Sequence, residues 1–106
     1  MLWIDIEGSS NYWNSETSKN IEFIQRIVNQ CQRLGIKYGI YTSKRDWTTI
    51  TGGTRNFARA PLWYAHYDND ASFNDFVPFG GWTRPSIKQY AGDQIECGVT
   101  IDRNYF

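Results

Sequence analysis

Leu2-Trp3-Ile4-Asp5-Ile6-Glu7-Gly8 is the stretch around which the chain is organised. Its β-branched and aromatic residues, ended by a glycine, predict a β-strand. Because side chains alternate along a strand, Trp3, Asp5 and Glu7 are expected on one face, with Leu2, Ile4 and Ile6 on the other.

The two carboxylates of this strand are expected close together. Two residues of rise separate Asp5 from Glu7, or about 6.6 Å at roughly 3.3 Å per residue. Like charges this close raise one pKa, and burial raises it further. Carboxyl groups about 5–10 Å apart carry out glycoside hydrolysis. A solvated face with two ordinary acids explains the same spacing equally well.

Composition excludes several classes of partner. The 106 residues suffice for one small domain, and 11 basic side chains balance 11 acidic ones without a basic stripe. This argues against nucleic acid and against an anionic membrane surface as partners. No apolar run approaches the ~18 residues that span a bilayer, and no signal peptide is visible.

Aromatic residues are abundant, at 17% of the chain, and many lie in expected loops. Loop aromatics can stack on sugar rings, although packing against the sheet is the simpler interpretation for most of them. The two cysteines, Cys31 and Cys97, leave a disulfide and free thiols both open. With His66 as the single histidine, too few soft ligands remain for a zinc site. His66 itself is either a proton carrier or a hydrogen-bonded or surface residue of a strand.

The first half of the chain predicts a strand–helix–strand unit. Apolar residues recur at three- and four-residue steps from Ile21 to Leu34, which predicts a helix of about four turns ended by Gly35. A second strand follows at 36–43, parallel to the first. A short helix or turn is expected at 44–51. The candidate N-caps of the long helix are Ser15, Thr17 and Ser18.

The second half predicts three more strands, at 62–67, 86–90 and 99–102. A 17-residue loop, 68–84, separates the first two, and loops of this length tend to be functional. A turn is expected at 92–98. The predicted fold class is therefore α/β, with about five strands and one main helix, and neither a repeat nor a linker divides residues 1–106.

Several stretches, in order, resemble one enzyme family. The chain is similar to the Chalaropsis-type lysozymes, glycoside hydrolase family 25, in these segments: Trp3-Ile4-Asp5-Ile6-Glu7-Gly8, Gly39-Ile40-Tyr41-Thr42-Ser43, Leu62-Trp63-Tyr64-Ala65-His66-Tyr67, Lys88-Gln89-Tyr90 and Ile101-Asp102-Arg103-Asn104-Tyr105-Phe106. The resemblance implies an irregular β/α (TIM-like) barrel. It also implies a muramidase that cleaves the β-1,4 bond between N-acetylmuramic acid and N-acetylglucosamine in peptidoglycan, without metal or cofactor.

The resemblance also implies roles for individual residues. Glu7 corresponds to the general acid, Asp5 to its partner, and Asp102 to an acid that lines the same cleft. Asp5 either stabilises the charge that develops at the anomeric carbon or orients the substrate's acetamido group as an internal nucleophile. The positions that shape the sugar site are Tyr41, Trp63, Tyr67 and Gln89.

The family's first strands, including an Asp-x-Ser segment, precede the motif that Asp5 and Glu7 match. A complete barrel takes at least ~200 residues. The resemblance therefore implies that residues 1–106 form the C-terminal half of a lysozyme barrel, with impaired activity. The alternatives are a non-catalytic cell-wall sugar-binding module and an inactive fragment. We also expect self-association through the open half-barrel, and an extracellular or lysosomal/phagosomal location.

Overall fold

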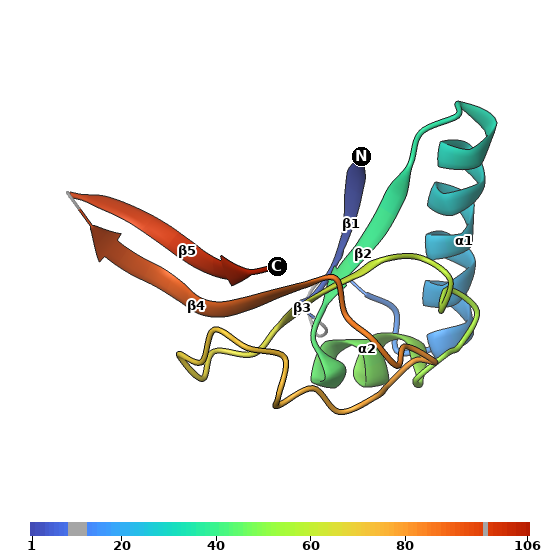
Figure 1. Cartoon of the computed structure of the whole chain (residues 1–106). Coiled ribbons are helices and arrows are strands. Elements are labelled where there is room, and N and C mark those ends of the chain that lie inside the picture. Colours follow the sequence, from blue (N-terminus) through green and yellow to red (C-terminus); the bar gives the residue numbers. More distant parts are fainter. Residues whose placement is uncertain (9–12, 97) are drawn as a thin grey trace.

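The computed structural model describes residues 1–8, 13–96 and 98–106. These residues form five strands joined into one sheet and two helices (Figure 1). In chain order the elements are β1 (Leu2–Ile6), α1 (Thr17–Arg33), β2 (Tyr38–Thr42), α2 (Lys44–Thr51), β3 (Leu62–Ala65), β4 (Ile87–Glu96) and β5 (Val99–Tyr105).

The sheet has the strand order β1-β2-β3-β4-β5, so β1 lies at one edge. The first four strands are parallel, as predicted for the first two, and β5 is antiparallel to β4. The register sets Asp5 opposite Tyr41, and Tyr41 opposite Trp63. Further along, Ala65 lies opposite Gln89. Residues distant in sequence thus meet across neighbouring strands.

The end of the sheet differs from its prediction. The turn expected at 92–98 is wrong, because β4 runs on to Glu96 and pairs with β5. The pairing shifts register on either side of Ala91, and Asp93 has φ 53°. Such bulges let a strand carry residues of low strand propensity, which is why the sequence suggested a turn. The β4–β5 hairpin extends away from both helices (Figure 1).

Helix α1 packs one face against the sheet and α2. Its buried side chains are Asn20, Ile24, Val28 and Cys31. The N-cap is Glu16, which makes no side-chain cap bond, so the three predicted caps are wrong. Asn20 instead ties the helix start to its neighbours, because Nδ2 donates to Ile50 O at 2.9 Å. Cys31 is a buried free thiol, whereas Cys97 lies outside the described residues.

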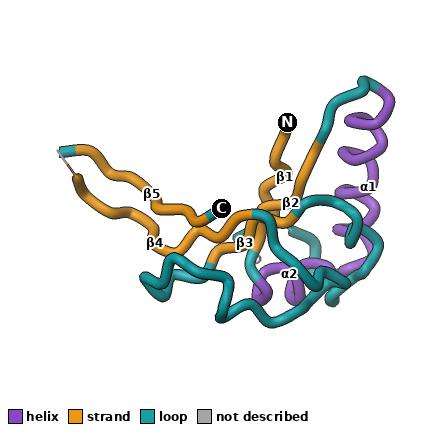
Figure 2. Tube along the Cα trace, viewed as in Figure 1, coloured by secondary structure: helices purple, strands orange, loops and turns teal. Residues whose placement is uncertain are grey.

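The core lies between the sheet and the two helices. Helices cover one side of the strands, and long loops close the base of the molecule (Figure 2). No helix in the described part of the chain is long and apolar enough to cross a membrane. The fully or nearly buried core residues include Ile4, Ile6, Ile24, Ile40, Trp47, Ile50, Leu62 and Trp82.

Candidate active site

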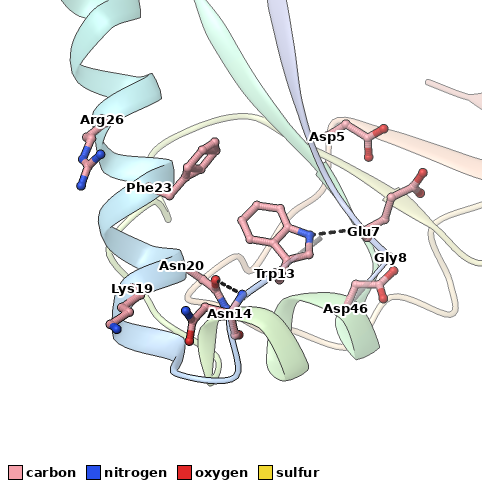
Figure 3. Close-up of a pocket in the computed structure, with 10 residues that line it drawn as sticks. All are labelled: Asp5, Glu7, Gly8, Trp13, Asn14, Lys19, Asn20, Phe23, Arg26 and Asp46. Carbon is pink, nitrogen blue, oxygen red and sulfur yellow. Dashed lines mark hydrogen bonds between the residues drawn. The ribbon is translucent and has the colours of Figure 1, made fainter. Parts of the chain in front are cut away.

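The acids of β1 lie as the alternation predicted. Ile4 and Ile6 point into the core, 6% and 1% exposed, whereas Asp5 and Glu7 are exposed on the opposite face. Figure 3 shows both carboxylates on the same side of β1. The strand thus holds two charges outside the core while its other face anchors it in place.

A third carboxylate, Asp46, joins them and was not predicted. It lies in the first turn of α2, where its backbone N–H donates to Ser43 Oγ at 3.1 Å and its Oδ2 accepts from the same hydroxyl at 3.0 Å. Ser43 and Asp46 form a pattern close to a capping box, directly after a strand that neighbours β1. That pattern was the signal available in the sequence. Asp5, Glu7 and Asp46 are called the acid trio below.

Burial and neighbouring negative charge raise the pKa values of two of these acids, Asp5 and Glu7. Burial, and then the charge of Asp46, raise the pKa of Asp5. Burial, Asp5 and Asp46, in that order, raise the pKa of Glu7. Among the described residues no lysine, arginine or histidine forms an ion pair with any of the three. Asp5 and Glu7 therefore both keep their protons to a higher pH than free carboxyl groups do.

A hollow of about 820 Å³ lies beside the acid trio. Trp13 stands between the acids and α1, and its indole N–H donates to Glu7 O at 2.9 Å (Figure 3). Trp13 also meets the Phe23 ring edge-to-face, with 5.9 Å between centroids. Carboxylates thus line one side of the hollow and the rings of Trp13 and Phe23 line another, a combination found in sugar-binding sites. The remaining lining residues are Gly8, Asn14, Lys19, Asn20 and Arg26.

Four predicted site residues form a second group, called the Gln89 network below. Gln89 Oε1 accepts from the hydroxyls of Tyr41 at 2.5 Å and Tyr67 at 2.7 Å. Gln89 Nε2 donates to Asp102 Oδ2 at 2.9 Å. Burial raises the pKa of Tyr41, and Tyr67, Glu7 and Asp5 raise it further. The network therefore lies within the electrostatic reach of the β1 acids.

Trp63 makes ring contacts with Trp3 of β1 and with Tyr41 of the Gln89 network. Its ring packs edge-to-face on Trp3 and Tyr41, with centroids 5.6 and 4.7 Å apart, and its N–H donates to Asn104 Oδ1 at 2.9 Å. Gly39 makes room for this arrangement, because a Cβ there would lie 2.4 Å from the Trp3 ring. All seven predicted site residues are thus described: two in the acid trio, four in the Gln89 network, and Trp63 in contact with Tyr41.

A further charged group, the Lys88 cluster, was missed. Lys88 is fully buried, and its Nζ contacts Asp68 at 2.8 Å and Asp75 at 2.7 Å. It also donates to Asp70 O at 2.8 Å. His66 directly follows β3 and is exposed, and its Nδ1 lies 2.5 Å from Asp75 Oδ2, as in the expectation of a hydrogen-bonded or surface residue.

The Lys88 cluster depresses carboxylate pKa values. Burial raises the pKa of Asp75, but hydrogen bonds from Lys88, His66 and Tyr64 outweigh it and lower that pKa to about 2. A hydrogen bond from Lys88 likewise lowers the pKa of Asp68. The lysine ammonium already occupies the space between these carboxylates, so the chain supplies the cation itself. The cluster fixes the 68–84 loop to β4.

Comparisons with known proteins agree on one family. A family model described as "Lysozyme-like protein 1" matches residues 1–90. Two relatives are from Dictyostelium discoideum: "Probable GH family 25 lysozyme 5" is 47% identical over 99% of this chain, and "Counting factor 50" is 43% identical over all of it. The chain spans 49% and 35% of their lengths, respectively.

A solved structure shares the fold. The muramidase from Acremonium alcalophilum superposes with a TM-score of 0.77 at 28% identity, over 98% of this chain and 49% of its own. The mixed five-stranded sheet with two helices is therefore similar to about half of a muramidase fold.

Proposed function

Since this chain belongs to the lysozyme-like proteins of glycoside hydrolase family 25, we propose that it forms the C-terminal half of a peptidoglycan hydrolase. The bond cleaved is the β-1,4 link between N-acetylmuramic acid and N-acetylglucosamine. The observation that carries the proposal is the acid trio: three carboxylates that form no ion pair with any described residue, beside an aromatic-walled hollow.

Glu7 is the general acid in this proposal. A general acid works best when its pKa lies near the working pH, and burial together with Asp5 and Asp46 raises that of Glu7. Asp5 remains ionised and faces the positive charge that develops at the anomeric carbon. Tyr41, Trp63 and Tyr67 supply ring faces and hydroxyls for the sugar.

The chain by itself is expected to be a slow enzyme. Asp5 and Glu7 are exposed, so water on their open side limits how far the pKa of Glu7 rises and weakens every electrostatic contact to the reacting sugar. β1 also lies at the edge of the sheet. Self-association at that edge remains a proposal, as does an extracellular or phagosomal location, which the substrate favours.

A non-catalytic sugar-binding module is the second candidate. Tyr67 is 58% exposed and Phe23 50% exposed, so aromatic surface is available to sugar rings whether or not Glu7 transfers a proton. This candidate predicts binding of chitooligosaccharides that survives Glu7→Gln. An inactive fragment, the third alternative, predicts neither binding nor turnover, and no cooperative unfolding of a monomer.

Digestion of purified peptidoglycan by the chain tests the proposal. We expect slow release of reducing ends that Glu7→Gln abolishes, because the amide has no proton to transfer. Glu22→Gln is the matched control, since Glu22 lies on the exposed face of α1 and pairs with Arg26 at 3.1 Å. It should digest like the unmodified chain.

The outcomes separate the candidates. Turnover that disappears only in Glu7→Gln supports the hydrolase. Equal turnover in the chain and in Glu7→Gln contradicts the role of Glu7. Binding of tri-N-acetylchitotriose by all three proteins without any turnover favours the sugar-binding module.

A further inference from the structure

The side chain of Gln89 is built into the sheet rather than presented to a ligand. It is 4% exposed, and both of its polar atoms are engaged. An amide oxygen has two lone pairs, and here one accepts from Tyr41 and the other from Tyr67. A residue so enclosed acts on a sugar only through its neighbours.

Asp102 decides which way the Gln89 amide faces. An ionised carboxylate only accepts hydrogen bonds, so the amide must turn its NH₂ group to Asp102 Oδ2, 2.9 Å away. The other carboxylate oxygen, Oδ1, accepts from the Asp93 backbone N–H at 2.9 Å. That second bond holds Asp102 in place. With the NH₂ group committed, only the carbonyl oxygen can face the two tyrosines.

The orientation of the Gln89 amide determines in which direction the tyrosine hydroxyls donate their protons. Each phenol has one proton, and both Tyr41 and Tyr67 donate it to the Gln89 carbonyl. The two hydroxyls also interact with each other, and the oxygen lone pairs that this contact leaves are available to other partners. A hydroxyl arranged in this way accepts a hydrogen bond from a ligand and cannot donate one.

We propose that Gln89 is a positioning residue that converts the negative charge of Asp102 into acceptor-only hydroxyls on Tyr41 and Tyr67. The site then favours ligand groups that donate, namely sugar hydroxyls and the N–H of an acetamido group. This part rests on the proposed function, because it takes the ligand to be an N-acetylated sugar. Asp102 thereby acts on the sugar through Gln89 and the two tyrosines rather than by direct contact.

Replacing Asp102 by asparagine should reverse the chain of hydrogen bonds. The Asp93 N–H still needs an acceptor, so the new amide turns its oxygen there and its NH₂ toward Gln89. Gln89 then flips, accepts through Oε1 and donates through Nε2 to both tyrosines. Their hydroxyl protons become free to point outward. In this reversed arrangement every buried polar group keeps a hydrogen-bond partner, which favours it in the variant.

A nuclear Overhauser experiment without ligand tests the orientation. In the unmodified chain, the Gln89 side-chain NH₂ protons should give their stronger cross-peaks to the β-protons of Asp102. In Asp102→Asn the stronger cross-peaks should move to the ring protons of Tyr41 and Tyr67. Asp93→Asn is the matched control, because it removes a nearby charge but keeps the backbone N–H. An unchanged pattern in Asp102→Asn overturns the proposal.

Binding of tri-N-acetylchitotriose tests the consequence. Asp102→Asn should weaken binding about tenfold, the loss expected for about one hydrogen bond. In a Tyr41→Phe/Tyr67→Phe background, which has no hydroxyls to orient, the same substitution should change affinity less than twofold. A tenfold loss in that background means that Asp102 acts directly and overturns the proposal.

The two tests separate this inference from the proposed function. If the unmodified chain does not bind the trisaccharide, the sugar site is wrong and the tyrosines are not its acceptors. The cross-peaks decide the amide orientation independently of that result.

Discussion

The acid trio and the Lys88 cluster both gather carboxylates beside the same sheet, the trio at β1 and the cluster at β4, but of the two only the Lys88 cluster contains a buried cation. In the trio, burial and mutual repulsion raise the pKa values of Asp5 and Glu7. In the cluster, hydrogen bonds from Lys88 and other donors lower the pKa of Asp75 to about 2. The presence or absence of one ammonium thus reverses the behaviour of neighbouring acids.

The direction of the pKa shift distinguishes carboxylates that stabilise the fold from carboxylates that are candidates for reactivity. A carboxylate with a depressed pKa stabilises the fold near neutral pH, whereas one with a raised pKa destabilises it there. Charged groups with unfavourable electrostatics remain in a protein only where the rest of the fold compensates for their cost. Such groups are candidates for catalytic roles. The Lys88 cluster holds a loop, whereas the raised pKa values of Asp5 and Glu7 make the acid trio the candidate for proton transfer.

The largest expected effect comes from removing the cation. Lys88→Met leaves Asp68 and Asp75 without their partner and should destabilise the chain by about 3 kcal/mol, as breaking a buried ion pair does. Urea denaturation at pH 7 measures this loss. Lys37→Met, at an exposed position, is the control and should change stability by less than about 0.5 kcal/mol. Equal losses in both variants would remove the contrast between the two regions.

The second-largest effect should be a loss of unfolding free energy at acid pH. Because the pKa of Asp75 is lowered to about 2, its stabilisation is present above its unfolded pKa of about 3.9 and is lost as pH falls toward 2. The difference in unfolding free energy between the chain and Lys88→Met should therefore shrink between pH 4 and pH 2. Denaturation curves at several pH values measure it, and a constant difference would contradict the cluster's role.

Removing a charge from the acid trio should raise the unfolding free energy at pH 7, the opposite of removing Lys88. The pKa of Glu7 is raised, so its contribution to stability is full below its unfolded pKa and is lost as pH rises through its folded pKa. Glu7→Gln should therefore stabilise the chain at pH 7 by a few tenths of a kcal/mol, the usual size for exposed charges. At pH 3 the gain should vanish. Thermal melts at the two pH values give the answer, and a variant that is less stable at pH 7 would contradict it.

The smallest effect concerns Asp46. Asp46→Asn should lower the pKa of Glu7, because one of the charges that raise it is gone. A titration of the Glu7 side-chain carboxyl carbon by NMR measures the shift. Asp68→Asn changes a carboxylate of the Lys88 cluster instead and should leave the titration of Glu7 as it was. A Glu7 titration that ignores Asp46 would exclude Asp46 from the trio.

The sequence predicted the features of the site that depend on the alternation of side chains along a strand. Asp5 and Glu7 share an exposed face, because Ile4 and Ile6 occupy the core on the other. The parallel pairing of β1 with β2 also followed from the helix between them. Asp102 and Gln89 came from the resemblance to a family, not from any local pattern, and the structure joins them by a hydrogen bond.

Long-range pairing could not be predicted in the same way. Strand alternation puts Lys88 on the face opposite Gln89 but indicates no partner for it, because Asp68 precedes it by 20 residues and lies in a loop. Asp46 was missed since its position depends on how α2 follows β2. The length of β4 was missed because bulges near Ala91 admit residues that are typical of turns.

The position of β1 at the sheet edge has a consequence for amide hydrogen exchange. Leu2 N–H bonds to Lys37 O at 2.8 Å, so alternate residues of this parallel strand face β2, and the N–H groups of Trp3 and Asp5 face outward, where no described strand pairs with them. Those two amides should exchange quickly although Ile4 between them is protected. Slow exchange at Asp5 would then report that another strand has docked beside the acids.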